Sequence, residues 1–181
     1  MKMRCEAGVL RKVVLILIVM PVISCTAQVA GIITTGGREM SDDWGVDMTA
    51  ALFTIAVQPE EFPIAFEAGY GLSTGNMIFE EYQIRDYCAG ILKQWQIKES
   101  KAHYFIGGGI TKISAEYEPF IPPNYKDSVT GYYLHTGVFW RFENTFNLGI
   151  DYRYNFADNL DLGSSHDPSG FVISGFFGWR L

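Results

Sequence analysis

Between residues 146 and 156 the chain alternates between apolar and polar side chains. The apolar positions share one parity and are Phe146, Leu148, Ile150, Tyr152, Tyr154 and Phe156. The positions between them are Asn147, Gly149, Asp151, Arg153 and Asn155. Because successive side chains of a strand point to opposite faces, this pattern predicts a long strand with one apolar and one polar face. A tilted strand of about 9–11 residues is long enough to cross a bilayer.

The polar face of this stretch has an unusual composition for a strand on a protein surface. It holds glycine and side chains of opposite charge, where a strand exposed to water usually carries Lys, Glu and Thr. Glycine and opposite charges suit the narrow inside of a small barrel, and the apolar face then contacts lipid. The stretch therefore predicts one strand of a transmembrane β-barrel.

The same alternation predicts further strands on both sides of this stretch. They are 28–35, 43–57, 62–74, 79–97, 103–118, 129–142 and 171–181, and the stretch itself extends over 146–161. Lys93 falls on an outward face, which requires either a position near a membrane interface, where its stem can extend to water, or a bulge in the strand. Trp44 shares one face of its strand with Met48 and Ala50, and we expect Trp44 to contact lipid.

The connections between these strands alternate in length. Residues 58–61, 98–101 and 143–145 are short, whereas 119–128 and 162–170 are longer. In outer-membrane barrels the short turns are periplasmic and the longer loops are extracellular. Every backbone polar group within lipid must be paired, so the sheet must close on itself. We therefore predict an all-β fold, an eight-stranded antiparallel transmembrane β-barrel in the outer membrane, preceded by a cleaved signal peptide.

The predicted inward faces carry charged side chains at similar depths. With about eight strands the interior is just wide enough to be filled by side chains. We expect Glu67, His135, Asp151 and Arg153 to form a paired core, because an unpaired buried charge is costly. The other inward charges are Asp86, Arg141 and Arg180. A filled lumen with a structural or surface-interaction role is expected, rather than a wide aqueous pore.

Aromatic residues gather near the predicted strand ends, as in the girdles of membrane barrels. The side chains expected to contact outer-membrane lipid are Trp44, Trp95, Trp140, Phe142, Phe146, Ile150, Tyr152, Phe177 and Trp179. The chain holds 13 Phe, 10 Tyr and 19 Gly but only 19% charged residues, which agrees with aromatic girdles around a tightly filled lumen.

The N-terminus has the layout of a secretory signal peptide. Basic residues precede an apolar run at 13–23 that is too short to span a bilayer. Cleavage after Ala27 is our first interpretation, and it divides the chain into a signal peptide (1–27) and a barrel domain (28–181).

A second interpretation of this region remains open. Residues 22–25 resemble a bacterial lipobox, in which Cys25 would be lipidated and become the mature N-terminus. Cleavage after Ala27 would leave Cys88 as the only cysteine, and no disulfide could then form within the chain. It would also leave ten basic against 19 acidic residues, a net charge of −9 that argues against nucleic-acid binding and against docking on anionic lipid head groups.

The C-terminal half resembles a known class of proteins. The segments GYYLHTGVFWRF (131–142), FNLGIDYRYNFAD (146–158) and GFVISGFFGWRL (170–181) are similar to the small OmpA-like outer-membrane β-barrel proteins of Gram-negative bacteria. The resemblance implies a monomer that the barrel-insertion machinery recognises through its last strand. Many such proteins end in Phe, whereas this chain ends in Leu181.

The histidines offer little support for an enzyme. An outer-membrane hydrolase that modifies lipid A would need a His–Ser pair supported by an acid, and His166 adjoins Ser165 and Asp167. Sequence neighbours on a loop rarely form a working triad, and the inward His135 is expected to be a core residue. We therefore expect no catalytic residue.

The remaining candidate sites are also weak. Three scattered histidines have no metal-ligand spacing, and the glycines at 107–109 lack the Lys-Ser/Thr of a phosphate loop. Close strand approach or curvature explains those glycines better, and we expect no metal or cofactor. The alternative from another class is a soluble periplasmic lipocalin-like binder of small ligands, whose apolar face would point inward.

Overall fold

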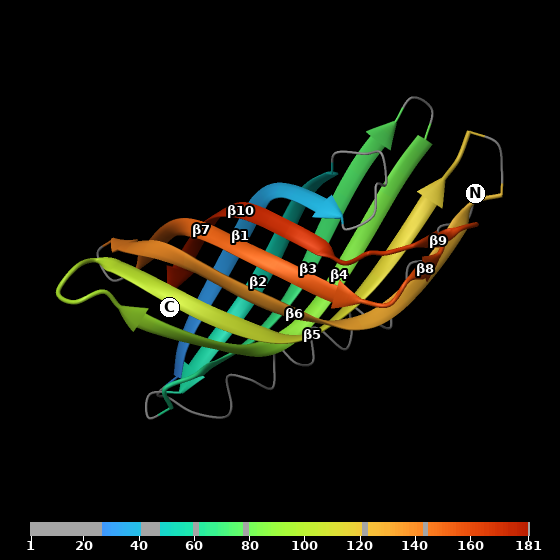
Figure 1. The fold of residues 1–181 in the computed structure, drawn as a ribbon. Helices are drawn as coiled ribbons and strands as arrows, with labels where there is room; N and C mark the ends of the chain where they lie inside the picture. Colours follow the sequence, from blue (N-terminus) through green and yellow to red (C-terminus); the bar gives the residue numbers. More distant parts are fainter. Residues whose placement is uncertain are drawn as a thin grey trace.

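The computed structural model describes residues 27–40, 48–59, 62–77, 80–120, 123–142 and 145–180. Within these residues eight antiparallel strands close into a barrel in the order β1-β10-β7-β6-β5-β4-β3-β2 (Figure 1). The barrel strands are β1 (Ala27–Met40), β2 (Met48–Pro59), β3 (Ala65–Met77), β4 (Glu80–Gln96), β5 (Ala102–Glu118), β6 (Tyr125–Phe142), β7 (Phe146–Ala157) and β10 (Gly170–Arg180). The predicted eight-stranded barrel is confirmed. Residues 1–26 of the predicted signal peptide lie outside the described part.

Several strands differ in length from their predicted segments. β1 continues to Met40 instead of ending at 35, because its alternation carries on and puts Arg38 inside the barrel. β6 begins at Tyr125, so part of the predicted loop 119–128 is strand. This part lies opposite the end of β5, where Tyr117 faces Tyr125 across the ladder.

The predicted loop after β7 contains a small hairpin. β7 ends at Ala157 rather than at 161, and the chain then forms β8 (Leu160–Asp161) and β9 (Ser165–His166). Leu160 and Leu162 are buried, so this hairpin packs against the barrel rather than extending into solvent.

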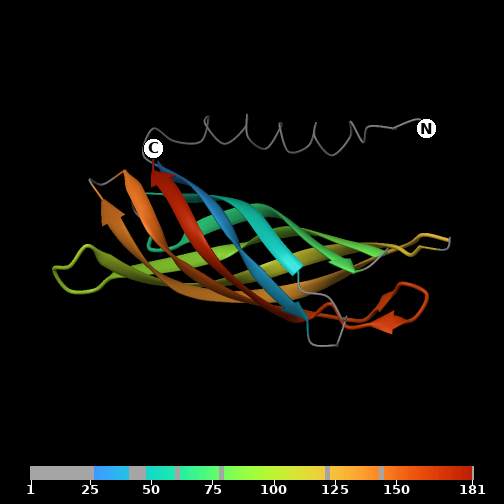
Figure 2. The ribbon, with the colours of Figure 1, turned by 90° about the horizontal axis from the view of Figure 1, so that it is seen from above.

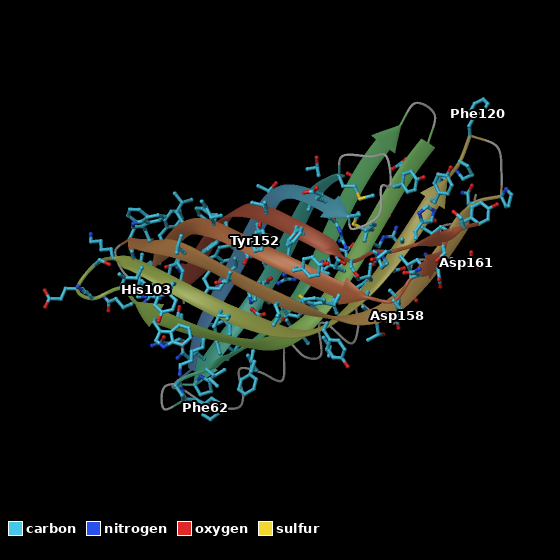
Figure 3. The ribbon with its side chains drawn as sticks, in the orientation of Figure 1. Phe62, His103, Phe120, Tyr152, Asp158 and Asp161 are labelled. Atoms are coloured by element: carbon cyan, nitrogen blue, oxygen red, sulfur yellow. The ribbon has the colours of Figure 1, made fainter. Side chains whose placement is uncertain are left out.

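The two ends of the barrel have different shapes. One end has three short turns, closed by backbone hydrogen bonds from Phe62 to Pro59, from Ser100 to Ile97 and from Thr145 to Phe142. At the other end β4, β5 and β6 are the longest strands, with 17, 17 and 18 residues, and they project furthest (Figures 1 and 2). We call these the turn end and the outer end. Figure 3 shows Phe62 and His103 toward the turn end and Phe120, Asp158 and Asp161 toward the outer end.

The outside of the barrel is largely apolar. Large side chains with about half of their surface exposed follow the middle of the strands, among them Phe66, Ile91, Ile106, Ile110, Leu134, Leu148, Ile150 and Ile173. The residues of the opposite parity on each strand point into the barrel, and most of them are buried. No helix among the described residues is long and apolar enough to cross a membrane.

The outward facing that the expectation for Trp44 implies for Met48 and Ala50 is wrong. Trp44 lies outside the described residues, but Met48 and Ala50, which share its parity, are buried inside the barrel. The outward residues of β2 include Thr49, Ala51 and Phe53. The error arises because the apolar face of this segment packs against the hydrophobic cluster at the outer end of the lumen rather than against lipid.

The lumen is filled in layers. A hydrophobic cluster at the outer end consists of Met48, Tyr82, Ile84, Ile113, Ala115, Leu160 and Leu162. A second cluster toward the turn end consists of Ala56, Ala65, Leu92, Phe105, Phe139 and Phe176. The interior also contains buried charged side chains, namely Glu67, Asp86, Asp151 and Arg153 among others.

Candidate functional site

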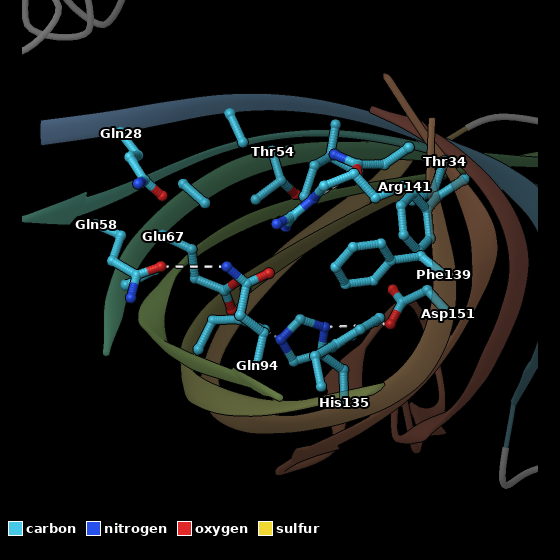
Figure 4. A pocket seen from close by; sticks show the side chains of 18 of the residues that line it. Gln28, Thr34, Thr54, Gln58, Glu67, Gln94, His135, Phe139, Arg141 and Asp151 are labelled. Atoms are coloured by element: carbon cyan, nitrogen blue, oxygen red, sulfur yellow. Dashed lines mark hydrogen bonds and ion pairs between the residues drawn. The ribbon is translucent and has the colours of Figure 1, made fainter. Parts of the chain in front are cut away.

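The central layer of the lumen is organised around His135 on β6. Its Nδ1 lies 3.2 Å from Asp151 Oδ1 on the neighbouring strand β7. Its Nε2 lies 3.0 Å from Glu67 Oε1 on β3, which is on the other side of the lumen (Figure 4). The second contact is within ion-pair distance but lacks hydrogen-bond alignment. One imidazole thus connects two carboxylates that belong to distant strands.

Tyr133 makes a second link across the lumen to Glu67. The tyrosine hydroxyl donates a hydrogen bond of 2.5 Å to Glu67 Oε1. Gly90 and Gly109 occupy the two strands between these residues, in one continuous row of the sheet. A methyl group at Gly90 would collide with the Tyr133 hydroxyl, and one at Gly107 would collide with His135. The predicted close approach at residues 107–109 is confirmed.

Arg153 lies in the same layer but has different partners from those expected. Its guanidinium stacks 4.4 Å from the centre of the Tyr133 ring, and its Nη1 lies 3.4 Å from Cys88 Sγ on β4. No carboxylate of the described residues lies within 4.0 Å of it, and its Nε has no hydrogen-bond partner there. Aromatic and thiol contacts therefore hold this cation, with Asp151 and Glu67 as more distant counter-charges.

A second buried pair joins β1 to β4. Arg38 Nη1 lies 2.5 Å from Asp86 Oδ2, and the two side chains are 0% and 11% exposed. The inward position of Asp86 was predicted, but its partner was missed. The predicted strand 28–35 ends before Arg38, although Arg38 continues the inward parity of residues 28–34. Arg38 also donates to the Pro168 carbonyl, so it attaches the long outer loop to the lumen.

The outer hairpin is held by hydrogen bonds as well as by its buried leucines. Asp127 on β6 accepts hydrogen bonds from the backbone N–H groups of Asp161 and Ser128, at 2.8 and 2.7 Å. These donors lower the pKa of the Asp127 carboxyl below its ordinary value. Ser169 donates to the Ala157 carbonyl and accepts from its N–H, which fastens the other end of the loop.

Between the central layer and the turn end the lumen is hollow. A cavity of about 80 Å³ is lined by small and aromatic side chains, with Ala30, Ala56, Phe105, Phe139 and Phe176 among them. Glu67, His135 and Asp151 line it as well, whereas Gln58 and Gln94, joined by a 3.1 Å hydrogen bond, belong to its amide-lined part (Figure 4).

The other predicted lumen residues lie apart from the central layer. Arg141 is half-buried beside this cavity, where its Nε lies 3.4 Å from Asn147 Oδ1 and its guanidinium 5.6 Å from the Phe139 ring centre. The backbone of Arg180 pairs with Ala30 in β1, but its side chain is not among those described.

The predicted lipid-facing residues that the structure describes all lie on the outward face. Trp140, Phe142, Ile150, Tyr152 and Phe177 are exposed, and Tyr152 is visible in the middle of the barrel in Figure 3. Phe146, Trp95 and Trp179 are half-buried among neighbours of the same face. Phe146 packs edge-on against Phe177 at 4.2 Å, and Trp95 stacks on Tyr104 at 4.8 Å. Lys93 is also on this face, with its ammonium 5.2 Å from the Trp95 ring centre.

The remaining histidines occupy opposite ends. His103 is buried and stacks on Phe139 at 4.9 Å. His166 Nε2 lies 2.8 Å from the hydroxyl of Ser164, not of the adjacent Ser165 considered from the sequence. Among the described side chains no group of three His, Cys, Asp or Glu is arranged to hold a metal ion.

The structure is similar to solved structures of small outer-membrane barrels. Neisserial surface protein A is 11% identical, with a TM-score of 0.69 over 86% of this chain and 97% of that chain. A major outer membrane protein from Thermus thermophilus is 9% identical, with a TM-score of 0.63 over 86% and 100% of the two chains. OprG from Pseudomonas aeruginosa is 10% identical, with a TM-score of 0.57 over 86% and 95%. No protein-family model matches the chain, and no curated protein matches its sequence. At these identities the similarity establishes the fold.

Proposed function

We propose that this chain is an integral outer-membrane β-barrel protein whose lumen is blocked, with a structural or surface-interaction role. The observation that carries the proposal is the distribution of side chains between the two faces. Isoleucine, leucine and aromatic residues cover the outside, whereas Arg38, Glu67, Asp86, Asp151 and Arg153 are buried within. A lipocalin-like soluble binder would have its apolar face inside and its charges in water. The outward apolar belt instead fits a hydrocarbon solvent.

The blocked lumen follows from what fills it. The links between β1 and β4, β3 and β6, and β4 and β7 cross the lumen with charged or polar side chains. Beyond them the outer hydrophobic cluster fills the barrel under the β8–β9 hairpin. These layers lie between the cavity at the turn end and the outer end of the barrel. We expect them to block a water column or a hydrated ion.

Two measurements test this proposal. Cell fractionation should place the protein in the membrane pellet, released only by detergent, whereas a soluble binder would appear in the periplasmic supernatant. The purified protein in a planar bilayer should show little or no steady conductance. A large and stable open channel in the unmodified protein would contradict the blocked lumen and would favour a porin.

The targeting of the chain is part of the proposal. We infer that residues 1–27 are a signal peptide. We also infer that the barrel-insertion machinery recognises the last strand and that the barrel is monomeric. Intact-mass measurement should show a mature N-terminus at Gln28 without acyl chains. A triacylated Cys25 would establish the lipobox interpretation instead.

We also infer that the chain is not an enzyme. The Ser164–His166 contact is the feature nearest to a hydrolase site, and it lies on the outer hairpin, where Ser164 is exposed to water. An assay for release of acyl chains from lipid A should therefore give the same background rate for the unmodified protein and for Ser164→Ala.

A further inference from the structure

Three outward-facing cations gather on one part of the barrel. Arg85 on β4, Lys112 on β5 and Lys126 on β6 lie on the outer face of neighbouring strands, toward the outer end. Every other lysine or arginine whose side chain the structure describes points into the lumen or lies toward the turn end. The full chain has a net charge of −6, so this clustering is not a consequence of a basic composition.

The three cations are only partly neutralised. Glu116 lies 3.7 Å from Arg85 and 3.6 Å from Lys126, so one carboxylate is shared by two cations. Lys112 is exposed and forms no ion pair with any described residue. Glu116 is therefore the one described carboxylate within ion-pair distance of these cations, and the next acidic side chains on this face, Glu81 and Glu118, are paired with each other one row farther from the barrel's middle.

Hydroxyl groups surround these cations. Lys112 is paired in register with Thr130, and Ser114 is paired with both Arg85 and Ser128. Paired residues of neighbouring strands project from the same face, so these side chains form one continuous surface. We call Arg85, Lys112, Lys126, Ser114, Ser128 and Thr130 the outer basic surface.

The outer basic surface lies directly next to the apolar outer surface of the barrel, on the side of the outer end. We call that apolar surface, which includes Ile106, Ile110 and Leu134, the apolar belt. The row directly below it joins Ile110 to Tyr132, whose exposed fractions are 56% and 68%. The next row joins Lys112 to Thr130. A membrane that covers the belt therefore places its outer head groups against the basic surface. This juxtaposition favours an amphiphile with an anionic head and several acyl chains.

We propose that the outer basic surface binds the phosphorylated sugar head group of a lipid A-type glycolipid in the outer leaflet. Arg and Lys donate charge-assisted hydrogen bonds to phosphate oxygens, and the hydroxyls are suited to sugar hydroxyls. The acyl chains would lie along the row of Ile110 and Tyr132. This inference rests on the proposed membrane location, and it names the lipid partner that the barrel would select.

The test compares two variants that remove the same number of positive charges. The first carries Arg85→Gln, Lys112→Gln and Lys126→Gln, and the control carries Lys93→Gln, Lys98→Gln and Lys101→Gln at the turn end. Each protein is folded in detergent and titrated with lipid A, and bound lipid is counted by native mass spectrometry. We expect the first variant to lose at least about tenfold in affinity and the control to lose little. Lipid A without its phosphates should bind the unmodified protein as weakly as intact lipid A binds the first variant.

Each other outcome has a definite meaning. Equal losses in the two variants, or no loss in the first, would overturn the proposed surface. If the unmodified protein does not fold into lipid vesicles, as judged by its heat-modifiable migration in gels, the membrane proposal itself fails. If it folds there but does not distinguish the two forms of lipid A, only this inference fails. Should the triple variant fail to fold, Lys112→Gln serves in its place, because Lys112 has no ion-pair partner among the described residues.

Discussion

The outer and turn-end halves of the lumen are packed in different ways. In the outer half, large side chains such as Tyr82, Ile84 and Ile113 are buried against the hairpin leucines. In the other half, Ala30, Ala56 and Ala65 face aromatic rings across a cavity of about 80 Å³. The charged layer around His135 separates the two. Both halves come from the same alternating strands, so the difference lies in the sizes of the inward side chains.

This contrast in packing indicates that the two halves contribute differently to the stability of the barrel. The central and outer layers link strands that are not neighbours in the sheet, as Arg38 and Asp86 do between β1 and β4. They therefore hold the barrel closed and block it. The turn-end half lacks such tight filling, and we expect it to accept substitutions that the outer half does not.

The largest effect is expected from breaking a charged link. Arg38→Met would leave Asp86 buried without its cation, and such a loss costs about 3–5 kcal/mol. Urea unfolding of the vesicle-inserted protein measures this free energy. Glu39→Gln, on the outward face next to it, is the control and should have little effect. If Arg38→Met were as stable as the control, the link between Arg38 and Asp86 would not hold the barrel closed.

A slightly smaller effect should come from placing a charge on the lipid face. Ile150→Arg near the middle of β7 should cost about 2–4 kcal/mol, because the cation would face hydrocarbon. Asn147→Arg should be milder, since Asn147 points into the lumen beside the cavity. The same urea titration ranks the two variants. The reverse order would show that inside and outside are exchanged, as in a soluble binder.

Adding the same two methyl groups to each half tests the packing contrast directly. Ala115→Val in the outer cluster should cost about 1–3 kcal/mol, the usual cost of overfilling a packed core. Ala56→Val should be neutral or stabilising, because the cavity beside it offers space. Equal costs for both variants in urea unfolding would remove the distinction between the two halves.

The smallest effect concerns the outer hairpin and depends on pH. The backbone donors lower the pKa of Asp127 in the folded state, so its contribution is complete above the unfolded pKa of about 3.9. That contribution is lost as pH falls through the lower folded value. Pepsin should therefore cut the hairpin of the vesicle-inserted protein more readily as the medium is acidified below pH 4. Asp127→Asn should be cut readily without that dependence, whereas Asp158→Asn should behave like the unmodified protein.

Sequence reasoning predicted the barrel because strand alternation is a local property. Each inward or outward position of β7 and β10 follows from the parity of its neighbours, and Ile150 and Asp151 could be assigned to opposite faces directly. The reasoning failed at Met48 and Ala50, since an apolar side chain can be buried by lipid or by a packed lumen. Alternation alone does not separate these two environments.

The sequence by itself determined the number of strands, the inward or outward direction of most side chains, and most of the charges inside the barrel, with Arg38 as the exception. Only the tertiary structure decided which of those charges meet. Glu67 approaches Tyr133 and His135 because closure brings β3 and β6 to opposite walls, and because Gly90 leaves space for the Tyr133 hydroxyl and Gly107 for the His135 ring. The pairing of Arg38 with Asp86, the cavity and the outer basic surface depend in the same way on the register between strands, which no single strand encodes.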